Sequence, residues 1–77
     1  MRIRFTAFGE KTLTERRAEI ASEYVARVLG DPYRSEVQPD GRRRLWGYIE
    51  EKRKWLRVIV LADGAVHNAF FDRRFKP

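Results

Sequence analysis

Apolar and polar residues alternate along several short stretches of this chain, and that period of two is typical of half-buried β-strands. The first stretch is RIRFTAF (2–8), which puts Ile3, Phe5 and Ala7 on one side and ends at Gly9. The same reasoning predicts strands at 42–50, 55–62 and 65–72, and a short, irregular strand at 33–38.

The residues from 12 to 29 follow a helical spacing instead. The segment TLTE (12–15) predicts a capping box, in which the Thr12 hydroxyl accepts a hydrogen bond from the Glu15 amide. Gly30 and Pro32 are placed to end the helix. Because Ser22 could cap a second helix, the helix is either continuous or broken near residues 21–22. The apolar face comprises Leu13, Ile20, Ala21, Tyr24, Val25, Val28 and Leu29.

The Asp63-Gly64 pair between two apolar strands predicts a two-residue hairpin turn of type I′, which fixes the register of the strands. The side chains on one face should then pack on the helix, with these expected partners: Ala62 with Ala65, Val60 with His67, Val58 with Ala69, and Leu56 with Phe71. The other face should pair Leu61 with Val66, Ile59 with Asn68, Arg57 with Phe70, and Trp55 with Asp72.

The strand at 42–50 sorts in the same way, with Leu45 and Ile49 pointing inward and Gly47 marking a bulge or a close backbone approach. Aromatic residues interleaved with arginines on an exposed sheet are typical of proteins that hold single-stranded nucleic acid. The alternative is that a partner or a second subunit of a homodimer covers this face. The tail RRFKP (73–77) is expected to leave the sheet. The predicted open face comprises Arg44, Trp46, Tyr48, Trp55, Arg57, Asn68 and Phe70, with Arg74 at its end.

The net charge of +6 lies entirely in the C-terminal half. Residues 1–41 carry seven basic and seven acidic residues, whereas residues 42–77 carry ten basic and four acidic residues. Thirteen of the 17 basic residues are arginine, whose planar guanidinium group suits phosphate and stacks on rings. A polyanion is therefore the expected partner, and we expect the basic turn at 50–54 to steer it rather than to specify it.

The chain has no cysteine and only one histidine, so we expect neither a disulfide nor a metal site. No apolar run approaches the roughly 20 residues that a membrane span needs, and MRIRFTAFGEK lacks a signal peptide's apolar core. A cytoplasmic domain without a cofactor is expected. A lone histidine on an apolar face is more often structural than catalytic, although His67 beside arginines would suit proton transfer on an RNA phosphodiester.

Three stretches carry a resemblance to a known family: TERRAEIASEYVARVLGDP (14–32), GRRRLWGYI (41–49) and KWLRVIVLADGAVHNAFF (54–71). In this order they resemble small RelE-like bacterial proteins, which are related to the colicin-type ribonuclease fold. That likeness implies an α+β fold spanning residues 1–77 as one domain, with an N-terminal strand and a helix packed on one face of the antiparallel sheet. Many relatives carry a histidine before the first helix, where this chain has Phe8, Gly9 and Glu10.

The resemblance also implies a function, namely a toxin of a toxin–antitoxin module that cleaves RNA without a metal. The implied partners are mRNA, with or without the ribosome, and a small antitoxin protein. The implied catalytic residues are Arg57, His67, Tyr48 and Arg74. Residues expected to bind nucleic acid are Arg44, Trp46, Asn68, Phe70, Arg73 and Lys76. The alternative is a basic RNA- or protein-binding module that keeps the fold without catalysis.

Overall fold

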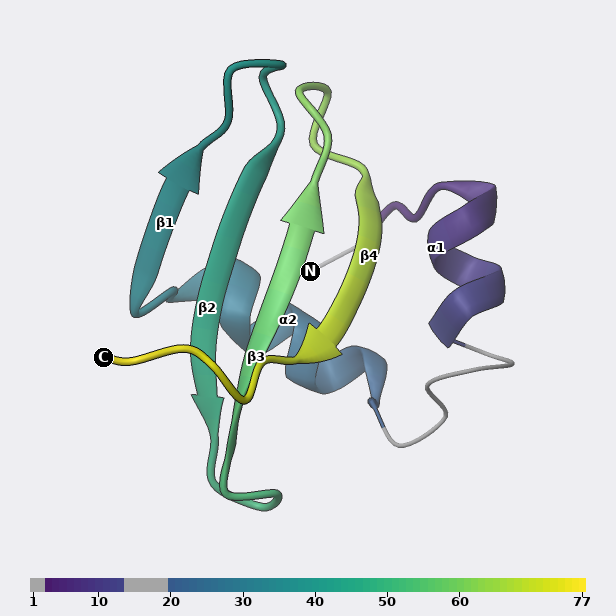
Figure 1. The fold of residues 1–77 in the computed structure, drawn as a ribbon. Helices are drawn as coiled ribbons and strands as arrows, with labels where there is room; N and C mark the ends of the chain where they lie inside the picture. The colour runs from purple at the N-terminus through teal and green to yellow at the C-terminus, as the bar shows by residue number, and fades with distance from the viewer. Residues whose placement is uncertain (1–2, 14–19) are drawn as a thin grey trace.

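Four strands form one antiparallel sheet in the order β1-β2-β3-β4 (Figure 1). The structure is a computed structural model that describes residues 3–13 and 20–77. The strands are β1 (Arg34–Val37), β2 (Arg43–Ile49), β3 (Lys54–Val60) and β4 (Val66–Phe71). Two helices pack against this sheet, so the predicted α+β class and the four strands between residues 33 and 72 are confirmed.

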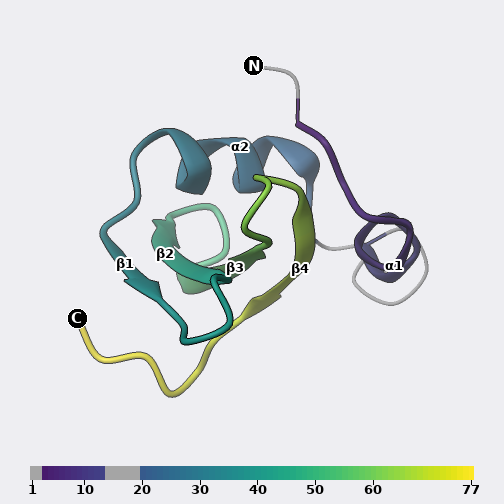
Figure 2. The same cartoon turned by 90° about the horizontal axis from the view of Figure 1, so that it is seen from above.

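The helix α2 (Ser22–Gly30) covers one face of the sheet, and the C-terminal segment runs over the other (Figure 2). On the face toward α2, the buried side chains of β2 and β3 are aliphatic and alternate along the strands: Leu45, Ile49, Leu56, Val58 and Val60. No helix in the described part of the chain is long and apolar enough to cross a membrane. The buried core comprises Ile20, Val25, Val28, Leu45, Ile49, Leu56, Val58, Val60, Val66 and Ala69.

Gly47 lies where β2 passes closest to α2. A Cβ atom at this position would stand 2.8 Å from Cγ2 of Val28, which is too close for a carbon–carbon contact. Of the two predicted roles for Gly47, the close backbone approach is therefore confirmed. The lack of a side chain at Gly47 lets α2 lie directly on β2.

The predicted strand at 2–8 is wrong, because residues 3–8 form no strand. Residues 3–6 are not helical, and Phe5 forms an isolated parallel bridge with Val66 at the edge of β4. The helix α1 (Ala7–Lys11) then begins, because the Thr6 hydroxyl accepts a hydrogen bond from the Gly9 amide at 2.9 Å and caps it. The alternation of Ile3, Phe5 and Ala7 fits any extended segment as well as a strand. It therefore gave no sign that Thr6 caps a helix.

The predicted capping box at 12–15 is not supported at Thr12, which follows α1 directly and lacks the extended backbone of an N-cap residue. Its backbone is helical (φ −61°, ψ −47°), and its amide donates to the carbonyls of Phe8 and Gly9. Glu15 lies outside the described residues, as do the other residues of 14–19. The alternative of a second helix beginning near residues 21–22 is confirmed, although Ala21 occupies the N-cap position and the Ser22 side chain does not cap.

The β3–β4 hairpin keeps the predicted register at four of its pairs. Leu56, Arg57, Val58 and Ile59 face Phe71, Phe70, Ala69 and Asn68, as expected. The register then shifts by one residue, so that Val60 faces Val66 instead of His67. The predicted pairing of Val60 with His67 is therefore wrong.

The turn itself explains this shift. The Gly64 amide donates to the Leu61 carbonyl and the Leu61 amide donates to the Ala65 carbonyl, so the loop has three residues, 62–64. A type I′ turn needs positive φ at both central residues, but only Gly64 (φ 94°) has it, and Asp63 does not. The predicted turn type is wrong, and the extra loop residue is compensated by the bulge at His67.

Candidate nucleic-acid interface

A row of alternating cations and rings crosses the face of the sheet that α2 leaves uncovered. Arg34 of β1 lies opposite Trp46 of β2, which lies opposite Arg57 of β3, which lies opposite Phe70 of β4. The guanidinium carbon of Arg57 stands 5.6 Å from the Trp46 ring centroid and 5.2 Å from that of Phe70. Both distances allow cation–π attraction, so Arg57 is held between two rings.

The C-terminal segment folds back over this row, and the prediction that residues 73–77 leave the sheet is wrong. In Figure 1 this segment crosses in front of β3 and β2. Phe75 stacks on Trp46 with ring centroids 5.0 Å apart and an interplanar angle of 18°. Trp46 is only 5% exposed as a result, which removes the ring that was expected to be a free stacking surface.

Five rings form what we call the aromatic cluster. Phe75 is its centre, since it contacts Trp46, Trp55 (centroids 4.9 Å apart) and Tyr33 (6.2 Å). Trp55 also contacts Tyr33 and Tyr48 edge to face at 4.9 and 5.2 Å. Tyr33 is 58% and Tyr48 46% exposed, so the cluster presents two half-exposed rings above a buried one. Its members are Tyr33, Trp46, Tyr48, Trp55 and Phe75.

Asp72 fastens the C-terminal segment to the sheet. Its Oδ2 accepts a hydrogen bond from Trp46 Nε1 at 3.1 Å and lies 3.7 Å from Arg57 Nη1. Its Oδ1 accepts from the Arg74 amide, and its own amide donates to the Trp55 carbonyl at 2.8 Å. Burial would raise the pKa of Asp72, but the hydrogen bonds from Trp46 and Arg74 and the charge of Arg57 outweigh this and leave the pKa below its usual value.

Arg57 is less free to bind a phosphate than the sequence suggested. Its side chain is 25% exposed and its charge lies beside Asp72. Its Nε is buried and has no hydrogen-bond partner. Cations that lie open to solvent around the aromatic cluster include Arg34, whose guanidinium stands 5.0 Å from the Phe75 ring, and Arg73 and Arg74 in the segment after β4.

His67 lies apart from the aromatic cluster and connects β4 to α1. Its Nδ1 shares a hydrogen bond of 3.1 Å with the Thr6 hydroxyl, and its ring stacks on Phe8 at 4.9 Å. Tyr48 lies level with Asp72, five residues along β4 from His67, which corresponds to about 17 Å of strand. These two side chains are therefore not within reach of one phosphodiester, which proton transfer would require.

The other predicted site residues surround the aromatic cluster without joining it. Arg44 lies opposite Glu36 of β1 and Ile59 of β3. Asn68 shares the outward face, but its Oδ1 accepts from the neighbouring Ala69 amide. Lys76 is exposed near the end of the chain.

Sequence reasoning did not assign Tyr33, Arg34 and Phe75 to the site. Their contacts in the site are with residues far away in the sequence. Tyr33 precedes β1, and its amide donates to the Trp46 carbonyl at 2.7 Å. The signal for Phe75 was a single ring inside the basic tail RRFKP, because an isolated aromatic residue in a charged segment needs an apolar partner. The signal for Tyr33 was its place directly before a strand.

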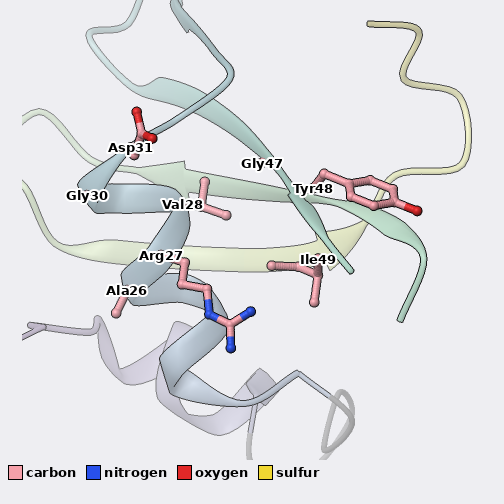
Figure 3. A pocket seen from close by; sticks show the side chains of 8 residues that line it. All are labelled: Ala26, Arg27, Val28, Gly30, Asp31, Gly47, Tyr48 and Ile49. Carbon is pink, nitrogen blue, oxygen red and sulfur yellow. The ribbon is translucent and has the colours of Figure 1, made fainter. Parts of the chain in front are cut away.

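A separate hollow lies between the C-terminal end of α2 and β2 (Figure 3). It has a volume of about 430 Å³. Val28 and Ile49 point into the space between helix and strand, whereas the Tyr48 ring points to the other side of β2. Its cation, Arg27, already forms a two-fold hydrogen-bonded ion pair with Glu51, at 2.8 and 2.5 Å. That pair lowers the pKa of Glu51 to about 2, and it leaves the described lining of this hollow without a free cation for a ligand.

Comparisons with known proteins identify no relative of this chain. A scan against protein-family models and searches of the curated proteins and of the solved structures found nothing that matches the chain. The resemblance to RelE-like proteins therefore stays a prediction. In residues 3–13 and 20–77, no group of three or more histidine, cysteine or acidic side chains is arranged to hold a metal ion.

Proposed function

We propose that this chain binds single-stranded RNA on the face of its sheet that carries the aromatic cluster. The observation that supports this most is the pair of half-exposed rings, Tyr33 and Tyr48, on a face bordered by arginines. Bases stack on aromatic rings irrespective of sequence, and cations alongside neutralise the phosphates. RNA is preferred to DNA here because of the sequence resemblance described above.

Binding is a better supported proposal than cleavage. Two of the implied catalytic residues, His67 and Tyr48, lie at different ends of the strands. His67 is already engaged by Thr6 and Phe8, and Arg57 by Asp72 and two rings. Cleavage of RNA, a role as a toxin, action on the ribosome and inhibition by an antitoxin stay predictions.

The test is a titration of fluorescein-labelled decauridylate, followed by fluorescence anisotropy, with the wild type and a Tyr33→Ala/Tyr48→Ala variant. Since each base–ring stack contributes about 1–3 kcal/mol, the loss of two stacks should weaken binding by the double variant at least about 30-fold. The matched control is Phe8→Ala, which removes a ring of similar exposure (50%) on α1 and should leave the affinity unchanged. Equal affinities for all three proteins would contradict the proposal.

The same samples test cleavage. The decauridylate is kept with the wild type in EDTA and analysed on a denaturing gel. An intact strand that binds with a strong salt dependence supports a binding module. Fragments that disappear with Arg57→Ala would make the chain a ribonuclease and show that binding alone is an incomplete description.

A further inference from the structure

A second concave surface lies at the end of the sheet where β2 turns into β3. It is a cleft of about 270 Å³ beside the aromatic cluster. The turn after β2, the beginning of β3 and the segment after β4 contribute its walls. The lining residues are Arg53, Lys54, Trp55, Phe71, Asp72, Arg73 and Phe75.

The cleft collects positive charge that the protein does not neutralise. Among the described residues, neither Arg53 nor Arg73 forms an ion pair, and Lys54 Nζ stands over the Phe71 ring at 5.3 Å. The only carboxylate in its walls is Asp72, whose two oxygens are already engaged by Trp46 and by the Arg74 amide. Three cations thus face a space whose one anion is occupied by other partners.

The backbone at Arg53 is in a conformation that arginine seldom adopts. Its φ is 53°, and it is the only non-glycine residue of the described chain with a positive φ. The turn holds it there, since the Arg53 amide donates to the Glu50 carbonyl and the Lys52 amide to the Ile49 carbonyl, both at 3.1 Å. Glycine would occupy this position without strain, so the sequence keeps an arginine where a better turn residue exists. Strain of this kind is concentrated at functional sites.

Rings complete the cleft. Trp55 and Phe75 belong both to its walls and to the aromatic cluster, with centroids 4.9 Å apart. The volume is below the range of about 300–1,000 Å³ that is typical for drug-sized ligands, so the space suits one nucleotide unit and not a longer ligand. Cations beside rings in a space of this size match the two parts of a nucleotide, its phosphate and its base.

We propose that this cleft is a nucleotide subsite, in which Arg53, Lys54 and Arg73 bind a phosphate and the rings of Trp55 and Phe75 contact the base. The proposal rests on the proposed RNA binding for its ligand, and it gives the strand a fixed point at one end of the aromatic cluster. The turn at 50–54 then specifies the position of the strand, whereas the sequence suggested that it only steers.

The decisive comparison is Arg53→Gly with Lys52→Ala. Both changes remove one positive charge from the same turn, but Lys52 does not line the cleft. Arg53→Gly should weaken decauridylate binding about tenfold. It should also reduce the slope of log affinity against log salt by about 0.7, the value for one phosphate contact to a single strand. Lys52→Ala should change the affinity by less than about twofold, because a solvated charge is screened.

The melting temperatures of the same variants show whether weaker binding is due to a loss of folding. Arg53→Gly relieves the strained φ, so its melting temperature should equal that of the wild type or exceed it by up to about 4 °C. A variant that folds at least as well and binds less tightly loses a ligand contact and not its structure. Arg53→Lys, which keeps the charge, should retain more of the affinity than Arg53→Gly. Equal losses for Arg53→Gly and Lys52→Ala would overturn the subsite.

A second measurement separates this proposal from the proposed function. Uridine 5′-monophosphate is added to the ¹⁵N-labelled protein, with uridine as the control that lacks the phosphate. The nucleotide should shift the indole signal of Trp55 and the amide signals of Arg53 and Arg73, and uridine should not. If the nucleotide shifts these signals but decauridylate does not bind, the proposed function fails and the subsite stands. If decauridylate binds and the nucleotide shifts none of them, the subsite is wrong and the proposed function stands.

Discussion

The two faces of the sheet carry different kinds of side chain. The fully buried side chains on the face toward α2 are aliphatic, among them Leu56, Val58 and Val60. The opposite face carries rings and arginines, and its cover is the irregular segment after β4 instead of a helix. Trp46 on this face is buried and stacks on Phe75. The first face has the composition of a permanent core, whereas the second is held by a few contacts to one short segment.

This difference shows how a small domain can combine stability with a binding surface. Aliphatic packing provides most of the folding free energy, because each buried side chain removes apolar area from water. The arginines on the outward face would cost free energy in such a core but can lie over rings. The predictions below test whether stability and ligand binding are divided in this way between the two faces.

The largest effect is expected on the face toward α2. Leu56→Ala leaves a cavity in a fully buried site and should lower the free energy of unfolding by about 3 kcal/mol, as measured by urea denaturation. Ile59→Ala is the matched control on the same strand, since Ile59 points outward and is only partly buried. It should cost about 1 kcal/mol. Equal losses would show that the two faces do not differ in their contribution to stability.

A smaller effect is expected from the cover of the outward face. Phe75→Ala removes the ring stacked on Trp46 and should lower the free energy of unfolding by about 1–2 kcal/mol. The tryptophan emission should move to longer wavelength and become more sensitive to acrylamide, because Trp46 becomes exposed. Lys76→Ala changes the next residue of the same segment and should alter neither property. An unchanged emission spectrum for Phe75→Ala would mean that this segment does not cover the sheet in solution.

The regular part of the fold could be predicted from the sequence, because strands and helices have a period that a few residues reveal. β2, β3 and β4 lie within two residues of their predicted positions, and four pairs of the last hairpin have the predicted register. The hairpin turn was wrong because its type depends on the φ angle of Asp63, and Asp-Gly is compatible with both loops. One loop residue was enough to move His67 out of the predicted pairing.

The candidate site could be predicted only as far as it follows the strands. Alternation put Trp46, Tyr48, Trp55 and Arg57 on one face, and the structure has them there. The contact between Phe75 and Trp46 joins residues far apart in sequence, and no local pattern encodes it. A tail without a period therefore looked like a free end. The structure also gives the Arg53 turn a left-handed residue that its composition did not indicate.

The smallest expected effect is on stability at acid pH. It compares Asp72 on the outward face with the ion pair of Glu51 and Arg27 near α2. The pKa of Asp72 in the folded protein is lower than its value of 3.8 in the unfolded chain. Its contribution to stability is therefore complete above that value and is lost as the pH falls through the still lower folded pKa. The pair of Glu51 with Arg27 near α2 follows the same sign between pH 4.5 and about 2, but both side chains lie at the surface, so salt screens their attraction. We expect Asp72→Asn to lower the free energy of unfolding at pH 7 by about 1 kcal/mol and to flatten its decline below pH 3.8.

Urea denaturation at several pH values in 1 M NaCl isolates this effect, because Glu51→Gln should then match the wild type. A decline in Asp72→Asn as steep as that of the wild type would show that Asp72 does not fasten the C-terminal segment to the sheet.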